Sequence, residues 1–446
     1  MRSVIRDVLA PGGDRRTVLN KLLQRDRFTV ANYQPGNYTG TLNASAWLNS
    51  IGAAPSLAQA TGANQPIVLP WSGENYLWTP TVAGNNATTP DAAPFDITGD
   101  ITLIYYGALD DWSPAGSGFL ATKDDTSTNR SYNFYTGGTG LLSFFGTNGA
   151  NTYSVNSSVA HGITDSTYKY VAVTRASSSG DTKFWLSDDG VTYAQLGTTQ
   201  STTAGTLFSG STQLKVMSLT TDNTIGKTKR VQIYSGIPAA FGGGGGTLAF
   251  DADFTKVPEG ATSFTESSSN AATVTINSTG ATPAQIVGSP SLLFDGAAHT
   301  MAMAPTLIQP ETIYMVGRQV SWTDTEAIFD GAALASGELI QTTATPQLNI
   351  PAGSSVAANT NLAVGTYGVI TAIFNGASSS LQIDSNAATT GNAGAAAMSG
   401  LTLGANGNDL LFGNIQVKEF IIRSTADSAV TQAAIQSLLK ALHGTP

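Results

Sequence analysis

From Tyr33 onward, hydrophobic residues recur in short blocks that alternate with polar residues, and clusters of Gly, Asn, Asp and Ser separate the blocks. An alternation with a period of two gives a strand one buried and one solvent-facing side. Short strands punctuated by turn residues at regular spacing are typical of antiparallel sandwiches. The pattern therefore predicts an all-β chain over most of its length.

The blocks form an internal repeat, which is the strongest signal of organisation in a chain of this kind. Each block of the first half has a counterpart in the second half, and the order is the same. The matched pairs are residues 62–68 with 280–287, 76–78 with 292–296, 100–106 with 311–316, 167–173 with 366–374, 184–190 with 381–386, and 229–234 with 417–422. The chain is therefore expected to hold two β-sandwiches of the same design.

A run of five glycines, residues 242–246, lies between the two copies. Glycine lacks a side chain and is flexible, so an uninterrupted run suits a linker better than a strand interior. We expect a first jelly roll over residues 33–241, a glycine linker over residues 242–246, and a second jelly roll over residues 247–446. Two domains also fit a length of 446 residues.

Both ends of the chain have a helical pattern. Near the N-terminus, Asp14 can cap a short helix with an apolar side. Residues 1–32 also carry seven of the 21 basic residues, which predicts a basic arm with attachment candidates Arg15, Arg16, Lys21 and Arg25. The alternative is a helix that packs on the first sandwich. Residues 426–442 have helical spacing and are followed by Gly444, so a terminal helix is expected.

Several of these blocks resemble the concanavalin A-like lectin and glucanase jelly roll, in particular its laminin-G-like branch. The residues that carry the resemblance are 291–296, 367–374, 381–384, 403–404 and 412–415. The tandem arrangement and the short basic leader also look like fibre or decoration proteins of tailed bacteriophages. This resemblance implies a virion protein of the capsid surface, head fibre or tail fibre, with other virion proteins as partners and a homo-oligomeric state such as a trimer.

Composition narrows the possible partners and compartment. The net charge of −9 argues against nucleic acid, which requires a cationic surface. The chain has no cysteine, so neither disulfides nor thiol chemistry are expected. The sequence shows no apolar run of signal-peptide or membrane-span length. A virion protein made in the host cytoplasm and released by lysis fits these features.

Catalytic patterns are weak. Enzymes that cleave glycosidic bonds use two carboxyl groups across the bond, and in glucanases of this fold these lie on one strand in an alternating acidic pattern that the chain lacks. The three histidines, His161, His299 and His443, are far apart and have no metal-ligand spacing. We therefore expect no enzyme activity, and the remaining alternative is a glycan depolymerase whose acidic pair is assembled by folding.

No cofactor is expected, and calcium is the metal that the residues fit best because it prefers oxygen ligands. The candidates are Asp124, Asp125, Asp188 and Asp189. Each pair is read equally well as a turn, in which aspartates accept hydrogen bonds from nearby backbone groups.

The first half carries most of the aromatic residues that could contact a sugar. The glycan-contact candidates are Trp112, Tyr132, Tyr135 and Trp185. Alternation places Tyr132 and Tyr135 on opposite sides of one strand, and the alternative role of these rings is core packing or chain-to-chain contact. The sequence thus predicts a non-enzymatic virion structural protein, with a host-glycan adhesin as the alternative.

Overall fold

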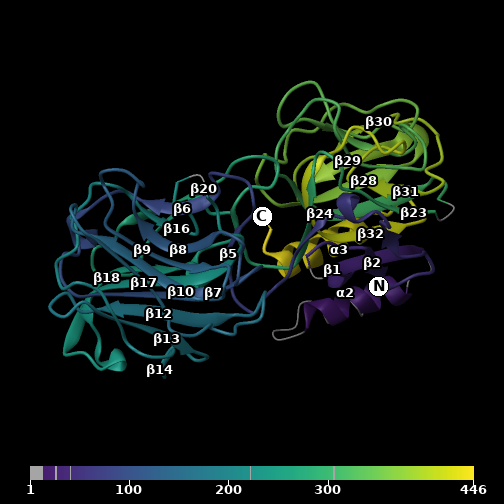
Figure 1. Cartoon of the computed structure of the whole chain (residues 1–446). Coiled ribbons are helices and arrows are strands. Elements are labelled where there is room, and N and C mark those ends of the chain that lie inside the picture. The colour runs from purple at the N-terminus through teal and green to yellow at the C-terminus, as the bar shows by residue number, and fades with distance from the viewer. Residues whose placement is uncertain (1–13, 26–27, 41, 221, 305–306, 446) are drawn as a thin grey trace. The chain divides into compact units, whose positions relative to one another are not determined.

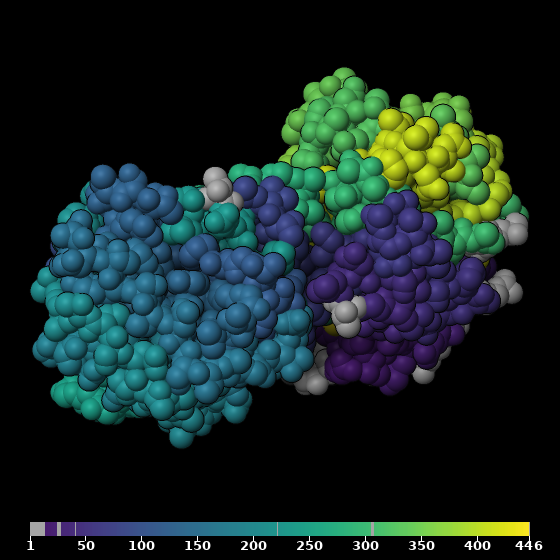
Figure 2. All heavy atoms as spheres, in the orientation of Figure 1, coloured from purple at the N-terminus to yellow at the C-terminus, as the bar shows by residue number. Residues whose placement is uncertain are grey.

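The computed structural model describes residues 14–25, 28–40, 42–220, 222–304 and 307–445 (Figure 1). The chain forms two compact units. Unit 1 contains Met1–Trp71 and Ser289–Pro446, and unit 2 contains Ser72–Gly288. In Figure 2 the purple N-terminal residues accordingly share a unit with the yellow C-terminal residues. Unit 2 is thus inserted into the chain of unit 1.

Unit 2 is a sandwich of two antiparallel sheets. The nine-stranded sheet has the order β14-β13-β12-β7-β17-β5-β21, with β15 beside β13 and β18 beside β17. The eight-stranded sheet has the order β11-β10-β9-β8-β16-β6-β20-β19. The strands of the first sheet are β5 (Tyr76–Thr79), β7 (Ile101–Leu109), β12 (Lys169–Arg175), β13 (Asp181–Ser187), β14 (Ala194–Gln195), β15 (Gln200–Ser201), β17 (Gly226–Ile237), β18 (Gly245–Asp253) and β21 (Gln285–Val287). Those of the second are β6 (Asn86–Thr89), β8 (Ser117–Lys123), β9 (Tyr132–Gly137), β10 (Leu142–Thr147), β11 (Thr152–Asn156), β16 (Leu214–Val216), β19 (Ser263–Thr265) and β20 (Thr273–Asn277).

The core of unit 2 lies between these sheets. Alternate residues of β7, Leu103 and Tyr105, meet Phe134 and Phe144 of the opposite sheet. Residues at the intervening positions of β7 lie outside this core, as a period of two requires. The expected alternation in the sequence is therefore confirmed.

Unit 1 is a second sandwich, in which one 15-stranded sheet provides both layers. One layer has the order β32-β24-β28-β29-β30, with β22 and β4 beside β32, and the other has β27-β26-β25-β31-β23-β3-β2. The long strand β1 pairs with both β2 and β32 and connects the layers. The strands are β1 (Thr29–Thr39), β2 (Ala46–Asn49), β3 (Leu57–Ala58), β4 (Ile67–Leu69), β22 (Ser291–Asp295), β23 (Met301–Met303), β24 (Glu311–Gln319), β25 (Ala327–Asp330), β26 (Leu339–Gln341), β27 (Leu348–Asn349), β28 (Gly368–Phe374), β29 (Ser379–Ile383), β30 (Thr389–Gly391), β31 (Leu401–Leu403) and β32 (Asn414–Arg423).

Two α-helices cover the outer side of the β24-β28-β32 layer of unit 1 (Figure 1). Helix α2 (Arg15–Arg25) has Asp14 before its first turn, and α3 (Ala429–His443) begins after Ser428 and ends at Gly444. Leu19 and Leu23 of α2 pack with Leu439 of α3 against the sheet. The expected terminal helix is confirmed. Short 3₁₀ helices η1 (Gly62–Asn64), η2 (Ala93–Phe95), η3 (Ala239–Phe241), η4 (Phe254–Lys256) and η5 (Gly376–Ser378) complete the fold.

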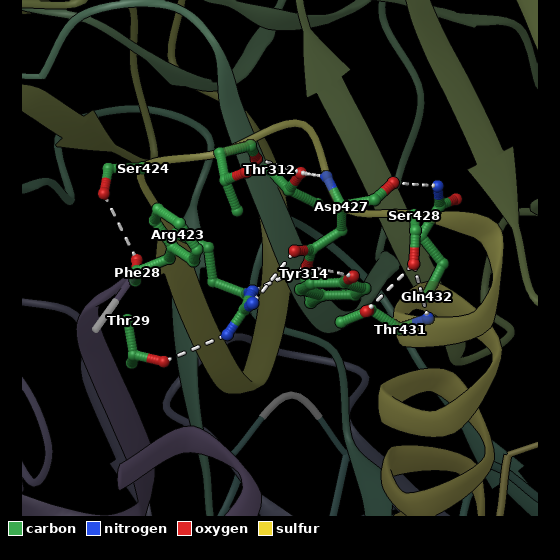
Figure 3. Close-up of polar contacts among 11 residues, drawn as sticks. Phe28, Thr29, Thr312, Tyr314, Arg423, Ser424, Asp427, Ser428, Thr431 and Gln432 are labelled. Carbon is green, nitrogen blue, oxygen red and sulfur yellow. Dashed lines mark hydrogen bonds and ion pairs between the residues drawn. The ribbon is translucent and has the colours of Figure 1, made fainter. Parts of the chain in front are cut away.

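A buried polar network joins the ends of unit 1 (Figure 3). The Arg423 guanidinium donates to both carboxylate oxygens of Asp427, at 2.6 and 2.9 Å, and to the Thr29 hydroxyl at 3.1 Å. The Tyr314 hydroxyl also donates to Asp427. Because Thr29 begins β1 and Asp427 precedes α3, the network ties the start of β1 and the start of α3 to β24 and β32.

The five-glycine linker was a wrong prediction. Gly242 lies in a turn after η3, and Gly245 already belongs to β18, which pairs along β17 from Arg230↔Asp253 to Ile237↔Gly245. The run is therefore the turn of a long hairpin inside unit 2. Glycine suits a turn for the reason it suits a linker, because it adopts a positive φ at no steric cost, as Gly242 does at +76°.

The free N-terminal arm also needs correction. Residues 15–25 are a helix whose apolar side is buried, which favours the alternative of a packed helix. However, it packs on the sandwich that contains the C-terminal residues, not on the first one. Residues 1–13 of the predicted arm lie outside the described residues. The all-β class with two antiparallel jelly-roll sandwiches is confirmed, although the two are nested in the chain.

Candidate functional site

The two units have equivalent strands, so equivalent positions can be compared through strand register. Strand β7 lies between β12 and β17 in unit 2, and β24 lies between β28 and β32 in unit 1. Tyr106 pairs with Tyr170, whereas Val316 pairs with Val369. Tyr106 and Tyr170 therefore occupy the positions of Val316 and Val369 on the outer side of the sheet.

This outer side differs between the units in what covers it. In unit 1, Tyr314, Val316, Val369 and Ile421 are buried under α2 and α3. Among the described residues of unit 2, the only helices are of the short 3₁₀ kind, and Tyr106 and Tyr170 are half-buried. We call this side of the nine-stranded sheet the aromatic face, and its members are Ile104, Tyr106, Tyr170, Ala172, Trp185, Tyr193, Arg230, Gln232, Tyr234 and Phe241.

The centre of the aromatic face is a stacked tyrosine pair. The rings of Tyr106 and Tyr170 are 3.8 Å apart and nearly parallel, at 2°. The turn at Gly190 allows the approach of Tyr170, because a Cβ on Gly190 would lie 2.6 Å from the Tyr170 ring. Burial raises the pKa of both tyrosines. Their hydroxyls are therefore protonated at neutral pH and can donate hydrogen bonds.

A β-bulge in β17 places a lysine beside this pair. The register shifts between Thr228 and Arg230, which leaves Lys229 as the extra residue. Its ammonium lies 4.4 Å from the centre of the Tyr168 ring and 3.1 Å from a Glu74 carboxylate oxygen. Unit 1 has the same arrangement. The register between β24 and β32 shifts so that Lys418 is the extra residue, and its ammonium lies 3.6 Å from the centre of the Tyr367 ring. This cation–π contact thus belongs to the shared fold and is not specific to the aromatic face.

The other half of the aromatic face surrounds Phe241. This residue lies at the end of η3, in the glycine-rich turn, and packs against Trp185 at 5.4 Å and Tyr193 at 4.6 Å between ring centres. It also covers Ile104 and Ala172. Trp185 is half-buried, and its indole N–H donates to the Thr174 hydroxyl. The glycine turn thereby supplies an aromatic cover for part of the sheet.

The charged groups around the aromatic face are paired with one another. Arg230 donates two hydrogen bonds of 2.7 Å to Asp251, and hydrogen bonding to this carboxylate raises the pKa of the guanidinium. Lys229 is paired with Glu74, and Lys169 lies 2.5 Å from Asp188. Paired charges leave little net field, so the face favours a neutral ligand with many hydroxyl groups over a highly charged one.

Of the four predicted glycan contacts, only Trp185 lies on the aromatic face. Trp112 and Tyr132 are fully buried in the core of unit 2, where their polar groups donate to the carbonyls of Thr167 and Phe95. They cannot stack on a ligand, because both rings are packed inside the core. Tyr135 is half-buried on the eight-stranded sheet and packs on Phe119. It therefore lies in the other sheet from Trp185.

Sequence reasoning missed Tyr106 and Tyr170 as site residues. The usable signal was alternation, because Leu103 and Tyr105 point into the core and leave Tyr106 on the outer side. The repeat gave a second signal, since the aligned blocks have tyrosine in the first half where the second half has valine. Without strand register, however, the alignment did not show that helices cover the valines.

The attachment candidates are largely used within unit 1. Arg16 lies 2.6 Å from the buried carboxylate of Glu419, and Arg15 donates to the carbonyl of Ala441 in α3. Lys21 is exposed, and the side chain of Arg25 lies outside the described residues. Arg15 and Arg16 therefore hold α2 in place.

The calcium candidates have the geometry of turns and ion pairs. Asp124 accepts from Arg130 and from Asn133, and Asp125 accepts from Ser127 and Asn129. Asp189 accepts from the backbone N–H groups of two following residues, which lowers its pKa to about 2, and Asp188 pairs with Lys169. Within the described residues, no three metal-ligating side chains come together. The turn interpretation fits all four aspartates.

The acidic pair that comes closest to catalytic chemistry is enclosed. Glu338 and Asp330 interact electrostatically, and burial raises the pKa of Glu338 to about 8. Both side chains are almost fully buried, at 2% and 0% exposure. A glycosidic bond must reach both carboxyl groups. This pair therefore does not fit a hydrolase.

Two of the histidines make structural hydrogen bonds. His161 is bonded within its loop, and His443 is bonded to Glu419.

One open pocket of about 520 Å³ lies in unit 1 beside α3. Its lining is polar or small, with Gln382, Ser385, Gln436 and Lys440, and it includes no aromatic ring. Gln436 is already hydrogen-bonded to Gln382. None of the described helices has the length and apolar character needed to cross a membrane. The aromatic face thus remains the best candidate for a binding surface.

No model of a known protein family matches the sequence, and no curated protein sequence matches it. Several solved structures are similar at low sequence identity. Domains LG4-5 of the mouse laminin alpha1 chain share 10% identity, with 80% of this chain and 95% of that chain covered and a TM-score of 0.32. The sialyllactose-bound CBM40 of the Ruminococcus gnavus IT-sialidase shares 15% identity, with 36% and 92% covered and a TM-score of 0.29. A pentraxin from Limulus polyphemus shares 9%, with 38% and 79% covered and a TM-score of 0.28.

Proposed function

We propose that this protein is a non-enzymatic glycan-binding protein and that the aromatic face of unit 2 is its contact surface. The observation that carries this function is the contrast between equivalent positions. Unit 1 has Val316 and Val369 buried beneath two helices, and unit 2 has Tyr106 and Tyr170 on a face that none of its described α-helices covers, since its described helices are all short 3₁₀ turns. Both tyrosines are half-buried, so part of each side chain remains accessible to a ligand.

The chemistry of the aromatic face suits sugars. Aromatic rings pack against the C–H faces of sugar rings, and hydroxyl and amide groups bond to sugar hydroxyls. The tyrosine hydroxyls and the half-buried Gln232 amide supply the second kind of contact. Because the neighbouring charges are paired, a neutral polysaccharide is the class of ligand that we favour.

We further propose that the protein acts at the surface of a virus particle. Support comes from the sequence, namely the phage-like tandem arrangement of its two sandwiches and its cysteine-free composition. In that setting it would be an adhesive or decoration protein with other virion proteins as partners, assembled as a homo-oligomer. Mass spectrometry of purified particles tests this placement, and absence of the protein from them would reject it.

The glycan function is tested by affinity electrophoresis of the full chain through soluble polysaccharides from bacterial envelopes. We expect at least one polymer to retard the protein. Tyr106→Ala combined with Tyr170→Ala should weaken that retardation roughly tenfold or more, because each aromatic contact contributes about 1 kcal/mol. Tyr135→Ala, in the opposite sheet, serves as the matched control and should bind like the parent.

Three results would count against the glycan function. They are no retardation by any polymer, equal binding by the double variant, and binding to a protein partner alone through the same tyrosines. A shortened polymer after incubation would instead point to a depolymerase and would contradict the non-enzymatic assignment.

A further inference from the structure

The boundaries of the sequence repeats and of the structural units do not coincide. The repeats meet at the glycine turn, whereas the chain passes between units at Trp71–Ser72 and at Gly288–Ser289. Each repeat therefore begins with a leading segment that lies in the other repeat's sandwich. The leading segments are residues 29–71, which hold β1 to β4, and residues 247–288, which hold most of β18 and all of β19 to β21.

We propose that the leading segments form a reciprocal docking interface, through which each half of the chain recognises and completes the other half independently of the covalent connection at the glycine turn. The partner that this interface fits is thus a second repeat of the same design. This inference stands apart from glycan binding, since it concerns a different set of contacts.

The first part of the interface is the pairing with the last strand of each sheet. Asn32 of β1 pairs with Ile421 of β32, and Asp251 of β18 pairs with Gln232 of β17. These pairs are equivalent. Ile421 lies opposite Tyr314 of β24, and Gln232 lies opposite Ile104 of β7. Tyr314 and Ile104 occupy the same position of the two central strands. The inward neighbours of Asn32 and Asp251 enter the two cores in the same way, with Ala31 and Tyr33 in unit 1 and Phe250 and Ala252 in unit 2.

The second part is the pairing with the first strand of each sheet. Val68 of β4 pairs with Leu292 of β22, and Ile286 of β21 pairs with Leu77 of β5. All four side chains are buried in their respective cores. Local pairing would have been the shorter path, because β4 immediately precedes β5 and β21 immediately precedes β22. The chain nevertheless pairs each of these strands with the other repeat.

Proline explains why the leading segments cross over instead of folding back. Pro70 follows the last residue of β4, and Pro290 precedes the first residue of β22. A proline restricts the preceding residue to extended backbone and lacks an N–H for pairing. The short connections are therefore biased towards continuing outward, which is the condition for segment exchange between identical elements.

Removing a leading segment would leave two sheet edges unpaired and one core open. Without residues 247–288, β17 would lose most of its pairing with β18, and β5 would lose its pairing with β21. The backbone groups of β17 and β5 that make these pairs would then be exposed. Unpaired edges next to open apolar surface drive association with any matching strand. Each half should therefore bind the other half tightly.

The test uses the full chain with a protease site inserted after Gly243, next to Gly244, where added atoms would meet open space. After folding and cleavage, the two fragments should elute together at the size of the uncut protein and separate only in denaturant. Two independent sandwiches joined by a glycine linker would separate at once in native buffer, and that result would overturn the inference.

Cysteine pairs give a second readout, because the chain contains no cysteine. Val68→Cys with Leu292→Cys should form an intrachain disulfide when oxidised during refolding, since directly opposed residues in antiparallel strands lie within bridging distance. The matched control, Val68→Cys with Leu77→Cys, represents local pairing and should not. If a variant fails to fold, the mirror pair Ile286→Cys with Leu77→Cys replaces it. A disulfide in the control alone would overturn the inference.

Discussion

At the scale of single residues, Glu338 is an unusual group, because it is an acid with almost no exposure. Its Oε1 has no hydrogen-bond partner, and its neighbour Asp330 already accepts four backbone N–H groups. Burial and the nearby carboxylate raise the pKa of Glu338 to about 8. The folded protein therefore keeps a proton on Glu338 that the unfolded chain releases near pH 4.5.

This difference predicts that the free energy of unfolding falls as the pH rises from about 4.5 to 8, because the unfolded state binds fewer protons in that range. At about 1.4 kcal/mol per pKa unit, this shift from 4.5 to about 8 corresponds to a loss of roughly 5 kcal/mol. Glu338→Gln should remove it and make the protein more stable than the parent at pH 8.5, but not at pH 4.5. Urea unfolding at the two pH values measures this.

The control for Glu338→Gln is Asp222→Asn, which changes an exposed acid in unit 2 and should leave the pH dependence intact. If Glu338→Gln and the parent lose stability equally between pH 4.5 and 8.5, Glu338 is not the responsible group.

Residue identity alone could not separate site from core. Trp112 and Tyr132 looked as suitable for sugar contact as Trp185, yet both are fully buried, because a loop tryptophan and an inward strand position supply core volume. Tyr106 was recognisable as an outward residue from alternation within β7. Its importance depends on helices elsewhere in the chain, which no local pattern reveals.

At the scale of elements, α2 is the clearest departure from the sequence prediction. Its basic residues indicated an attachment arm, but its apolar stripe decides its position, since Leu19 and Leu23 are fully buried. Burying such a side chain contributes roughly 2 kcal/mol, more than a surface ion pair. The helix therefore covers β24 and β28 together with α3.

This position predicts that Leu19→Ala with Leu23→Ala destabilises unit 1 by several kcal/mol, since each buried leucine truncation costs about 2–5 kcal/mol. Hydrogen exchange of the β24 and β28 amides should accelerate, while that of β7 and β12 in unit 2 should not. Lys21→Ala, on the exposed side of the same helix, is the control. Unchanged exchange in β24 would show that α2 is dispensable for unit 1.

The strands themselves were largely predictable, because their signals are local. Alternation and turn residues placed β7, β12, β13 and β17 and their counterparts in the correct order. Pairing partners were not predictable, because the sequence of β4 is compatible with pairing either to β5 or to β22. Choosing between the two depends on contacts far apart in the sequence.

At the scale of the whole molecule, the duplication explains both the fold and the candidate site. Unit 1 has the strand order of unit 2, but β1 and β32 are not joined to each other, whereas β17 and β18 are joined by the glycine turn. Helix α2 precedes β1 and α3 follows β32, and both cover the sheet of unit 1; among the described residues of unit 2, no α-helix covers the equivalent strands. The same glycine run that predicted a linker marks this difference.

The most direct test of the glycan function blocks the aromatic face itself. Gln232→Cys introduces the only thiol of the chain on that face, and a bulky maleimide can then be attached to it. Polysaccharide retardation should weaken only a few-fold before labelling, because one amide contact is lost, and should fall at least tenfold further after labelling. Thr152→Cys, exposed on β11 of the other sheet, should bind equally in both states. If the labelled Gln232→Cys protein still binds polysaccharide like the parent, the aromatic face is not the contact surface.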